Sequence, residues 1–199
     1  MKILIDNNPL EQPLPVVQTF PEFCELIMGI LLTRNLSIGS CEIDGTVVST
    51  LEEAHDLYSR GEICKIASIP LAVALEAALG HKCKDALKLE AECETLVTQA
   101  LLGEPTEIVS RWHSICEEIK SQVGFLPRLS GLLTEAQVNH LVDRQLKDLA
   151  KVMHALHAAF NAGDTLEISD SIELRLLPWL RQLRAFMENC LQLVKGLHR

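Results

Sequence analysis

The predicted secondary structure changes from strand to helix within residues 63–79, which read ICKIASIPLAVALEAAL. In residues 63–69 the side chains alternate between two faces, and this period of two is typical of a strand. From Leu71 onward apolar residues recur every three or four positions, which is the period of an amphipathic helix. The switch divides the chain into a strand-containing region, residues 1–69, and a helical region, residues 70–199.

The strand-containing region predicts a small sheet. A short apolar run at residues 1–6 (MKILID) and a second extended stretch at residues 14–18 predict a β-hairpin, with turn-forming residues 6–9 (DNNP) between them. Residues 38–43 alternate apolar and polar side chains and lead into Asp44-Gly45, a tight-turn dipeptide. We expect a third strand there.

Two helices are predicted between these strands. Thr19 occupies an N-cap position before a stripe whose members are spaced by three or four positions. The members of this stripe are Phe20, Phe23, Cys24, Ile27, Ile30 and Leu31. A short acidic helical turn follows at residues 51–58 and ends at Gly61. The first of these helices should cover one face of the sheet.

The helical region predicts about four long helices joined by short polar loops, as in an antiparallel bundle. The first stripe, stopped at residues 103–105, consists of Leu75, Leu79, Cys83, Ala86, Leu87, Cys93, Val97 and Leu101. The second, which ends around residues 124–131, consists of Ile108, Trp112, Ile115, Ile119 and Val123. The third consists of Val138, Leu141, Leu149, Val152, Met153, Leu156 and Phe160. Thr134 and Gln137 fit a capping box that opens this third helix, and residues 161–164 stop it.

The last helix has the most regular repeat in the chain. Its apolar residues, spaced by three or four throughout, are Ile172, Leu176, Leu180, Leu183, Met187, Cys190, Val194 and Leu197. We call this set the C-terminal seam, and it should bury the helix against other helices. Pro178 interrupts it and predicts either a kink or a short helix at residues 169–177 followed by a longer one. A homodimer closed by the seam is an open alternative.

Composition limits the class of partner. The 199 residues are 48% hydrophobic and include 27 acidic and 18 basic side chains, for a formal charge of -9. This indicates a folded, soluble and acidic protein. No basic tract is present, so we do not expect nucleic acid as a partner. Residues 1–69 hold ten acidic and four basic side chains, which favours this region for contact with a basic partner.

The sequence indicates a cytoplasmic protein. Only three apolar residues separate Lys2 from Asp6, too few for the apolar core of a secretory signal, and no stretch is long enough for a membrane span. The seven cysteines are irregularly spaced and form no C-x-x-C pair. We expect them to be reduced and mostly buried, not joined in disulfides.

Two histidines are the best candidates for a metal site. His154 and His157 lie three positions apart and share one face of the third helix of the helical region. The H-E-x-x-H pattern is absent and a further ligand is needed, for which His140 is a candidate. We expect no bound metal, and a metal- or thiol-dependent enzyme that uses His154 and His157 is kept as an alternative.

Other reactive groups fit structural positions. Cys83 and Cys116 each lie close to a histidine in sequence, yet both fall on apolar stripes, where burial raises the pKa of a thiol. Acidic pairs lie on predicted helix exteriors at Glu52-Glu53, Glu92-Glu94 and Glu117-Glu118. Phosphate-binding glycine loops and the G-x-S-x-G elbow are missing from the sequence. We therefore predict no catalytic residues and no cofactor.

The remaining candidates are contact surfaces. An edge strand of the sheet offers backbone hydrogen-bonding groups to which a partner could add a strand. Trp112 and Trp179 are the two largest side chains, and tryptophan is both highly buried on average and enriched at binding hot spots. Each is a candidate for partner binding or for packing inside the protein.

The order strand, strand, helix, strand, short helix, strand in residues 1–69 resembles the ubiquitin-like β-grasp superfamily. Carrier members of that superfamily act through a free C-terminal Gly-Gly, whereas here the last strand runs through Pro70 into a helix, so the resemblance does not imply carrier chemistry. The opening MKILID and residues 164–183 (DTLEISDSIELRLLPWLRQL) are similar to a group of uncharacterised bacterial proteins. That similarity implies no activity and no site residues.

Together these observations predict a non-enzymatic cytoplasmic interaction or adaptor protein with a protein partner. A helical, chaperone-like protein for a client helix is the nearest alternative. The enzyme that uses His154 and His157 is the alternative from another functional class.

Overall fold

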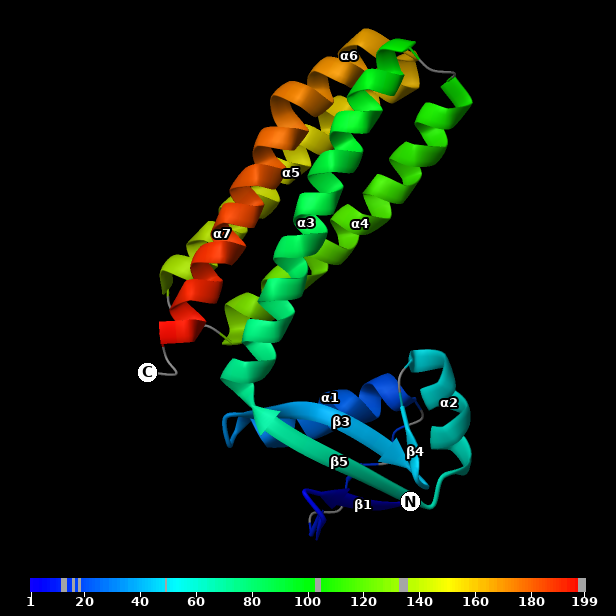
Figure 1. Cartoon of the computed structure of the whole chain (residues 1–199), viewed down its shortest axis with the longest axis vertical. Coiled ribbons are helices and arrows are strands. Elements are labelled where there is room, and N and C mark those ends of the chain that lie inside the picture. The colour runs from blue at the N-terminus through cyan, green and yellow to red at the C-terminus, as the bar shows by residue number, and fades with distance from the viewer. Residues whose placement is uncertain are drawn as a thin grey trace. The chain divides into compact units, whose positions relative to one another are not determined.

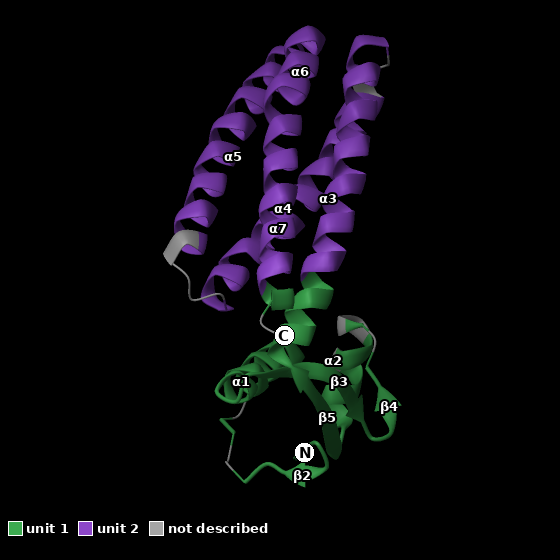
Figure 2. Ribbon diagram, turned by 60° about the vertical axis from the view of Figure 1, so that its left-hand side comes forward, with its two compact units in different colours: residues 1–78, 194–199 green, residues 79–193 purple. Residues whose placement is uncertain are grey.

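The computed structural model describes residues 1–11, 14–15, 17, 19–48, 50–102, 105–132 and 136–196, and of residues 51, 52, 55, 105, 106, 136 and 137 it describes the backbone alone. The fold is mostly helical α+β, with a small five-stranded mixed sheet followed by long helices (Figure 1). Two compact units divide the chain (Figure 2). The sheet unit comprises residues 1–78 and 194–199, and the helical unit comprises residues 79–193.

The sheet has the strand order β2-β1-β5-β3-β4. Its strands are β1 (Lys2–Ile5), β2 (Asn8–Pro9), β3 (Leu36–Ile43), β4 (Thr46–Val47) and β5 (Ile63–Pro70). β1 and β5 run parallel, and every other neighbouring pair is antiparallel. The strands predicted at residues 38–43 and 63–69 and the turn at Asp44-Gly45 are confirmed.

The first hairpin is tighter than the sequence suggested. β1 pairs with Asn8–Pro9 and not with residues 14–18, so the predicted second strand is wrong where the structure describes it; residues 16 and 18 lie outside the described part. The reason is the turn, because Asp6 (φ 49°) and Asn7 (φ 64°) are both left-handed. Two consecutive left-handed residues reverse the chain within a two-residue turn. Asp and Asn adopt this conformation more readily than most residues.

Two helices accompany the sheet, as predicted: α1 (Phe20–Leu32) and α2 (Leu51–Arg60). Thr19 caps α1, since its hydroxyl accepts from the backbone of Glu22 while the Glu22 carboxylate accepts from the backbone of Thr19. The core of the sheet unit consists of Phe20, Phe23, Ile27, Leu31, Cys41, Ile43, Ala54, Cys64 and Ile66. Burial of large apolar side chains contributes about 1.5–3 kcal/mol each and holds α1 on the sheet.

The helices after the sheet are α3 (Leu71–Leu102), α4 (Pro105–Leu132), α5 (Ala136–Ala162), α6 (Thr165–Ser171), the π-helical stretch η1 (Ile172–Leu176) and α7 (Leu177–Gly196). The second of the predicted helices is longer than expected. α4 continues through residues 124–131, where its end was predicted, because the buried Leu126 and Leu129 hold this segment in the core. The predicted capping box depends on Thr134, which lies outside the described residues.

The apolar stripes are confirmed for the most part. In the C-terminal seam every member from Ile172 to Val194 is buried, and Leu197 lies outside the described residues. Leu87, Leu101 and Leu141 were predicted to be buried but are exposed, with Leu89 and Val142 among the buried residues near them. For Leu87 and Leu101 the cause is repeated steps of four positions, because each such step overshoots a full helical turn by about 40°.

Pro178 is accommodated by a change of helix type. The chain forms the short helix α6 and the π-helical stretch before α7 begins at Leu177, so the short helix predicted at residues 169–177 is instead found at residues 165–171. The N–H of Leu177 bonds to the carbonyl of Ile172, five positions back. This wider turn directly before Pro178 is how the helix accommodates a residue without an N–H. In the described part of the chain, every helix is too short or too polar to cross a bilayer.

Candidate functional site

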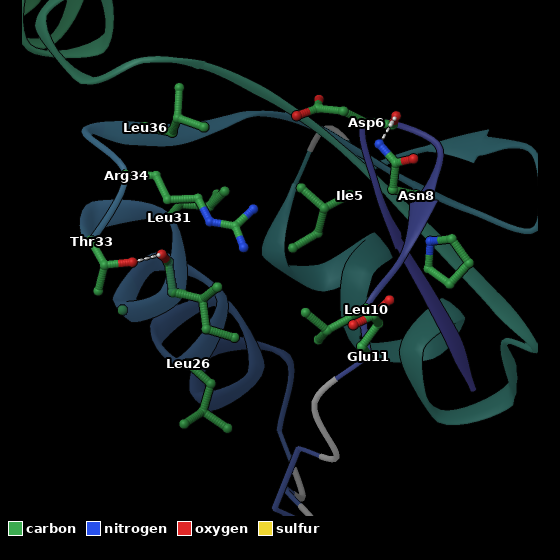
Figure 3. Close-up of a pocket in the computed structure, with 13 residues that line it drawn as sticks. Ile5, Asp6, Asn8, Leu10, Glu11, Leu26, Leu31, Thr33, Arg34 and Leu36 are labelled. Atoms are coloured by element: carbon green, nitrogen blue, oxygen red, sulfur yellow. Dashed lines mark hydrogen bonds between the residues drawn. The ribbon is translucent and has the colours of Figure 1, made fainter.

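A groove of about 570 Å³ lies in the sheet unit between the C-terminal half of α1 and the β1–β2 hairpin (Figure 3). Pockets that bind small molecules have volumes in this range. The hairpin exists because of the left-handed Asp6 and Asn7, so the turn that the sequence placed at residues 6–9 also forms one wall of the groove.

Apolar side chains supply much of the lining. Leu26, Ile30 and Leu31 come from α1, while Ile5 and Leu10 come from the hairpin and the residue after it. Leu31 belongs to the core, and the other four are only half-buried. The groove thus leaves apolar surface in contact with water, which an apolar ligand group would cover.

Several polar groups of the lining are already satisfied within the chain. The carboxylate of Asp6 accepts hydrogen bonds from the hydroxyl (2.7 Å) and the backbone N–H (2.8 Å) of Ser68. These bonds lower the pKa of Asp6. The side-chain amide of Asn8 donates to the Asp6 carbonyl (3.2 Å), and the Thr33 hydroxyl donates to the carbonyl of Ile30 (2.7 Å). These hydrogen bonds hold the two sides of the groove, the β1–β2 turn and the end of α1, in place.

Two charged side chains of the lining, Arg34 and Glu11, have no such partner within the described chain. Arg34 follows α1, and its guanidinium extends toward the side of the groove where Ile5 lies (Figure 3). Glu11 lines the groove from the hairpin side, across from α1 (Figure 3). Among the described residues neither side chain has an ion-pair partner. Both charges are therefore available to a ligand.

The predicted metal candidates are solvent-exposed on α5. His154 and His157 lie three positions apart as expected, and His140 lies near the start of the same helix. The Nε2 atom of His157 is 3.0 Å from the side-chain nitrogen of Asn161. Over the described side chains, no group of three or more His, Cys, Asp or Glu residues is arranged to hold a metal ion.

Both tryptophans pack against other helices of the helical unit. Trp179 is only 4% exposed, and its indole N–H donates to the backbone carbonyl of Gln145 (3.0 Å). Trp112 is half-buried and stacks on Phe160, with 5.1 Å between the ring centroids and 18° between the planes. A role for either residue in partner binding stays a prediction.

The cysteines include one feature that the sequence did not reveal. Cys83 and Cys116 are half-buried, and burial raises their pKa as expected. Cys41 and Cys64 lie in neighbouring strands with 3.5 Å between their sulfur atoms. The register pairs Cys41 with Ile66, so the two cysteines are diagonal neighbours. Diagonal positions are about 7–8 Å apart at Cα, farther than a disulfide usually spans.

A buried carboxylate is the second feature that the sequence did not reveal. Glu90 on α3 is only 6% exposed, and its carboxylate accepts from Nε of Arg184 on α7 (2.7 Å). Its neighbours Glu92 and Glu94 are exposed, as predicted, and so are Glu53, Glu117 and Glu118, while the side chain of Glu52 lies outside the described part. No spacing in the sequence marks Glu90, because its partner lies 94 positions away.

Chemically, the groove offers apolar surface, the guanidinium of Arg34 and the carboxylate of Glu11, while the carboxylate of Asp6 is already bonded to Ser68. Comparison of the chain with protein-family models, with curated proteins and with solved structures finds no match.

Proposed function

We propose that this chain is a non-enzymatic interaction protein, an adaptor, whose sheet unit binds a segment of a partner protein in the groove between α1 and the β1–β2 hairpin. The observation that carries the proposal is the lining of that groove, where half-buried apolar side chains adjoin Arg34 and Glu11. Water-exposed apolar surface bordered by available charges is typical of a binding site.

The topology supports the same conclusion. In the order β2-β1-β5-β3-β4 the parallel pair β1–β5 is central, and α1 follows the first hairpin, as in the ubiquitin-like β-grasp arrangement. We assign residues 1–69 to that arrangement and the helices from α3 onward to an antiparallel bundle. Both architectures are commonly used for binding, which fits a cytoplasmic adaptor.

A photo-crosslinking experiment tests this function. A photoreactive amino acid replaces Asn8, at the rim of the groove, and in a separate variant replaces the exposed Lys151 on α5 as a control. In cells that express the full chain, we expect a protein adduct of defined mass at position 8 that weakens when Arg34→Glu is added.

The control site makes the outcome decisive. Absence of a protein adduct at position 8 above the background at position 151 would contradict the groove-based adaptor. An adduct at position 151 alone would instead favour the chaperone-like role of the helices.

A further inference from the structure

We infer that the groove recognises a peptide segment with a large apolar side chain that has a carboxylate on one side and a basic group on the other. This inference rests on the proposed function and adds the chemistry of the partner. It follows from two properties of the groove, its apolar surface and the placement of its charges, and one glycine in its helical wall allows a test.

The apolar surface selects the central residue of the segment. Leu26 and Ile30 on α1 and Leu10 beyond the hairpin are each half-buried, and all three line the groove. A volume of about 570 Å³ holds a large side chain together with the backbone on either side of it. Covering these side chains removes apolar surface from water, which is the general source of affinity for such anchors.

Arg34 is the group that binds the carboxylate of the peptide. It is the one cationic side chain among the residues that line the groove, and no described residue pairs with it. The acidic side chain of the hairpin turn, Asp6, already accepts two hydrogen bonds from Ser68. A guanidinium presents a planar fork of donors that fits a carboxylate, so a ligand with an acidic group next to its apolar anchor gains a charge-assisted contact.

Glu11 is the group that binds the basic side chain of the peptide. Its carboxylate lines the opposite wall, on the hairpin side, and is exposed. Residues 1–69 carry ten acidic and four basic side chains, so the surroundings of this wall also favour a cation. Because the two charges stand on different walls, they fix the direction in which the segment lies.

Gly29 provides the means to test the site without disturbing the fold. It lies inside α1 and lines the groove, and a Cβ added there meets nothing within 4 Å. Gly124, inside α4, is equally open but belongs to the helical unit. Leucine favours helices more than glycine does, so both Gly29→Leu and Gly124→Leu should retain or raise the melting temperature. Only the first places a side chain in the groove.

The experiment pans a phage-displayed library of random peptides on the full chain and counter-selects on the Gly29→Leu variant. We expect enriched peptides in which Leu, Ile, Met or Phe stands between an acidic and a basic residue. A synthetic peptide of this consensus should bind wild type and Gly124→Leu equally and Gly29→Leu about tenfold more weakly. Arg34→Glu should lose about tenfold for this peptide and recover when the acidic residue of the peptide is replaced by lysine.

Three results would overturn the inference: no enriched peptide, a consensus without an acidic residue, or equal binding by the Gly29→Leu variant. None of them alters the crosslinking result at position 8. An adduct at position 8 together with any of these failures would leave the adaptor function standing and reject only the proposed ligand chemistry.

Discussion

Glu90 carries a carboxylate inside the helical unit, and the surrounding side chains stabilise its charge. Nε of Arg184 donates to it at 2.7 Å, and Arg181 lies 3.8 Å away. Arg184 also donates to the carboxylate of Glu188, and its hydrogen bonds to Glu90 and, second, to Glu188 raise the pKa of Arg184. A carboxylate taken out of water depends on such partners, because desolvation of the charge is otherwise uncompensated.

Arg184→Ala should therefore lower the free energy of unfolding by about 3 kcal/mol, since it leaves a buried carboxylate without its main donor. Arg181→Ala is the matched control. Its side chain is 54% exposed and lies farther from Glu90, so a loss below about 1 kcal/mol is expected. Urea denaturation measures both, and equal losses in the two variants would contradict the assigned role of Arg184.

Asp6 gives the sheet unit a pH-dependent contact. Hydrogen bonds from Ser68 lower its pKa below the ordinary 3.8, so the stabilisation is present above that value and is lost as the pH falls through the lowered pKa. Asp6→Asn keeps a residue that tolerates the left-handed turn but removes the charge. At about pH 7 this variant should melt below wild type, and the difference should shrink below about pH 4. A difference that stays constant with pH would contradict this account.

At the scale of elements, two prolines within helices differ in their expected cost to stability. Pro127 lies inside α4, where it removes the hydrogen bond to the carbonyl of Val123, and its ring is exposed. Pro127→Ala should therefore raise the free energy of unfolding by about 1–3 kcal/mol. Pro178→Ala should change it by less than about 1 kcal/mol, because the π-helical stretch already accommodates the proline. Thermal and urea unfolding of both variants would test this, and an equal gain in the two would contradict it.

Local chemistry explains which elements the sequence predicted well. The Thr19 cap and the spacing of three and four located α1, and alternation located β3 and β5, because these signals act within a few residues. The return strand of the first hairpin was misplaced because two left-handed residues shorten the turn. The end of α4 was misplaced because long-range packing of Leu126 and Leu129 overrides the local breakers.

The groove was harder to predict than the elements around it. Arg34 and Glu11 lie in connecting segments without any periodic pattern, and Gly29 stands in a helix as an ordinary interruption. Their proximity depends on pairing between β1 and β5 and on the packing of α1, neither of which a local pattern specifies. The apolar part of the lining was foreseeable, since Ile30 and Leu31 belong to the predicted stripe of α1.

For the whole molecule, the C-terminal seam bears on oligomeric state. All its described members are buried within a single chain, so a homodimer built on this seam would have to displace these contacts. We therefore predict that light scattering gives the mass of one chain, 22.1 kDa, at micromolar concentration. A mass twice as large that persists on dilution would contradict this prediction and would require an interface on another surface.

The strand order also sets a sequence of events during folding. In the described sheet, β1–β2 and β3–β4 are local hairpins that can form early, and β5 is the element that joins them. The contact between Asp6 and Ser68 joins residues that are 62 positions apart in the sequence. Contacts between such distant residues form slowly compared with hairpins and helices. We therefore expect the sheet to be completed only when residues 63–70 pair with β1 on one side and β3 on the other. Variants that weaken β5 should slow refolding more than equally destabilising variants confined to either hairpin.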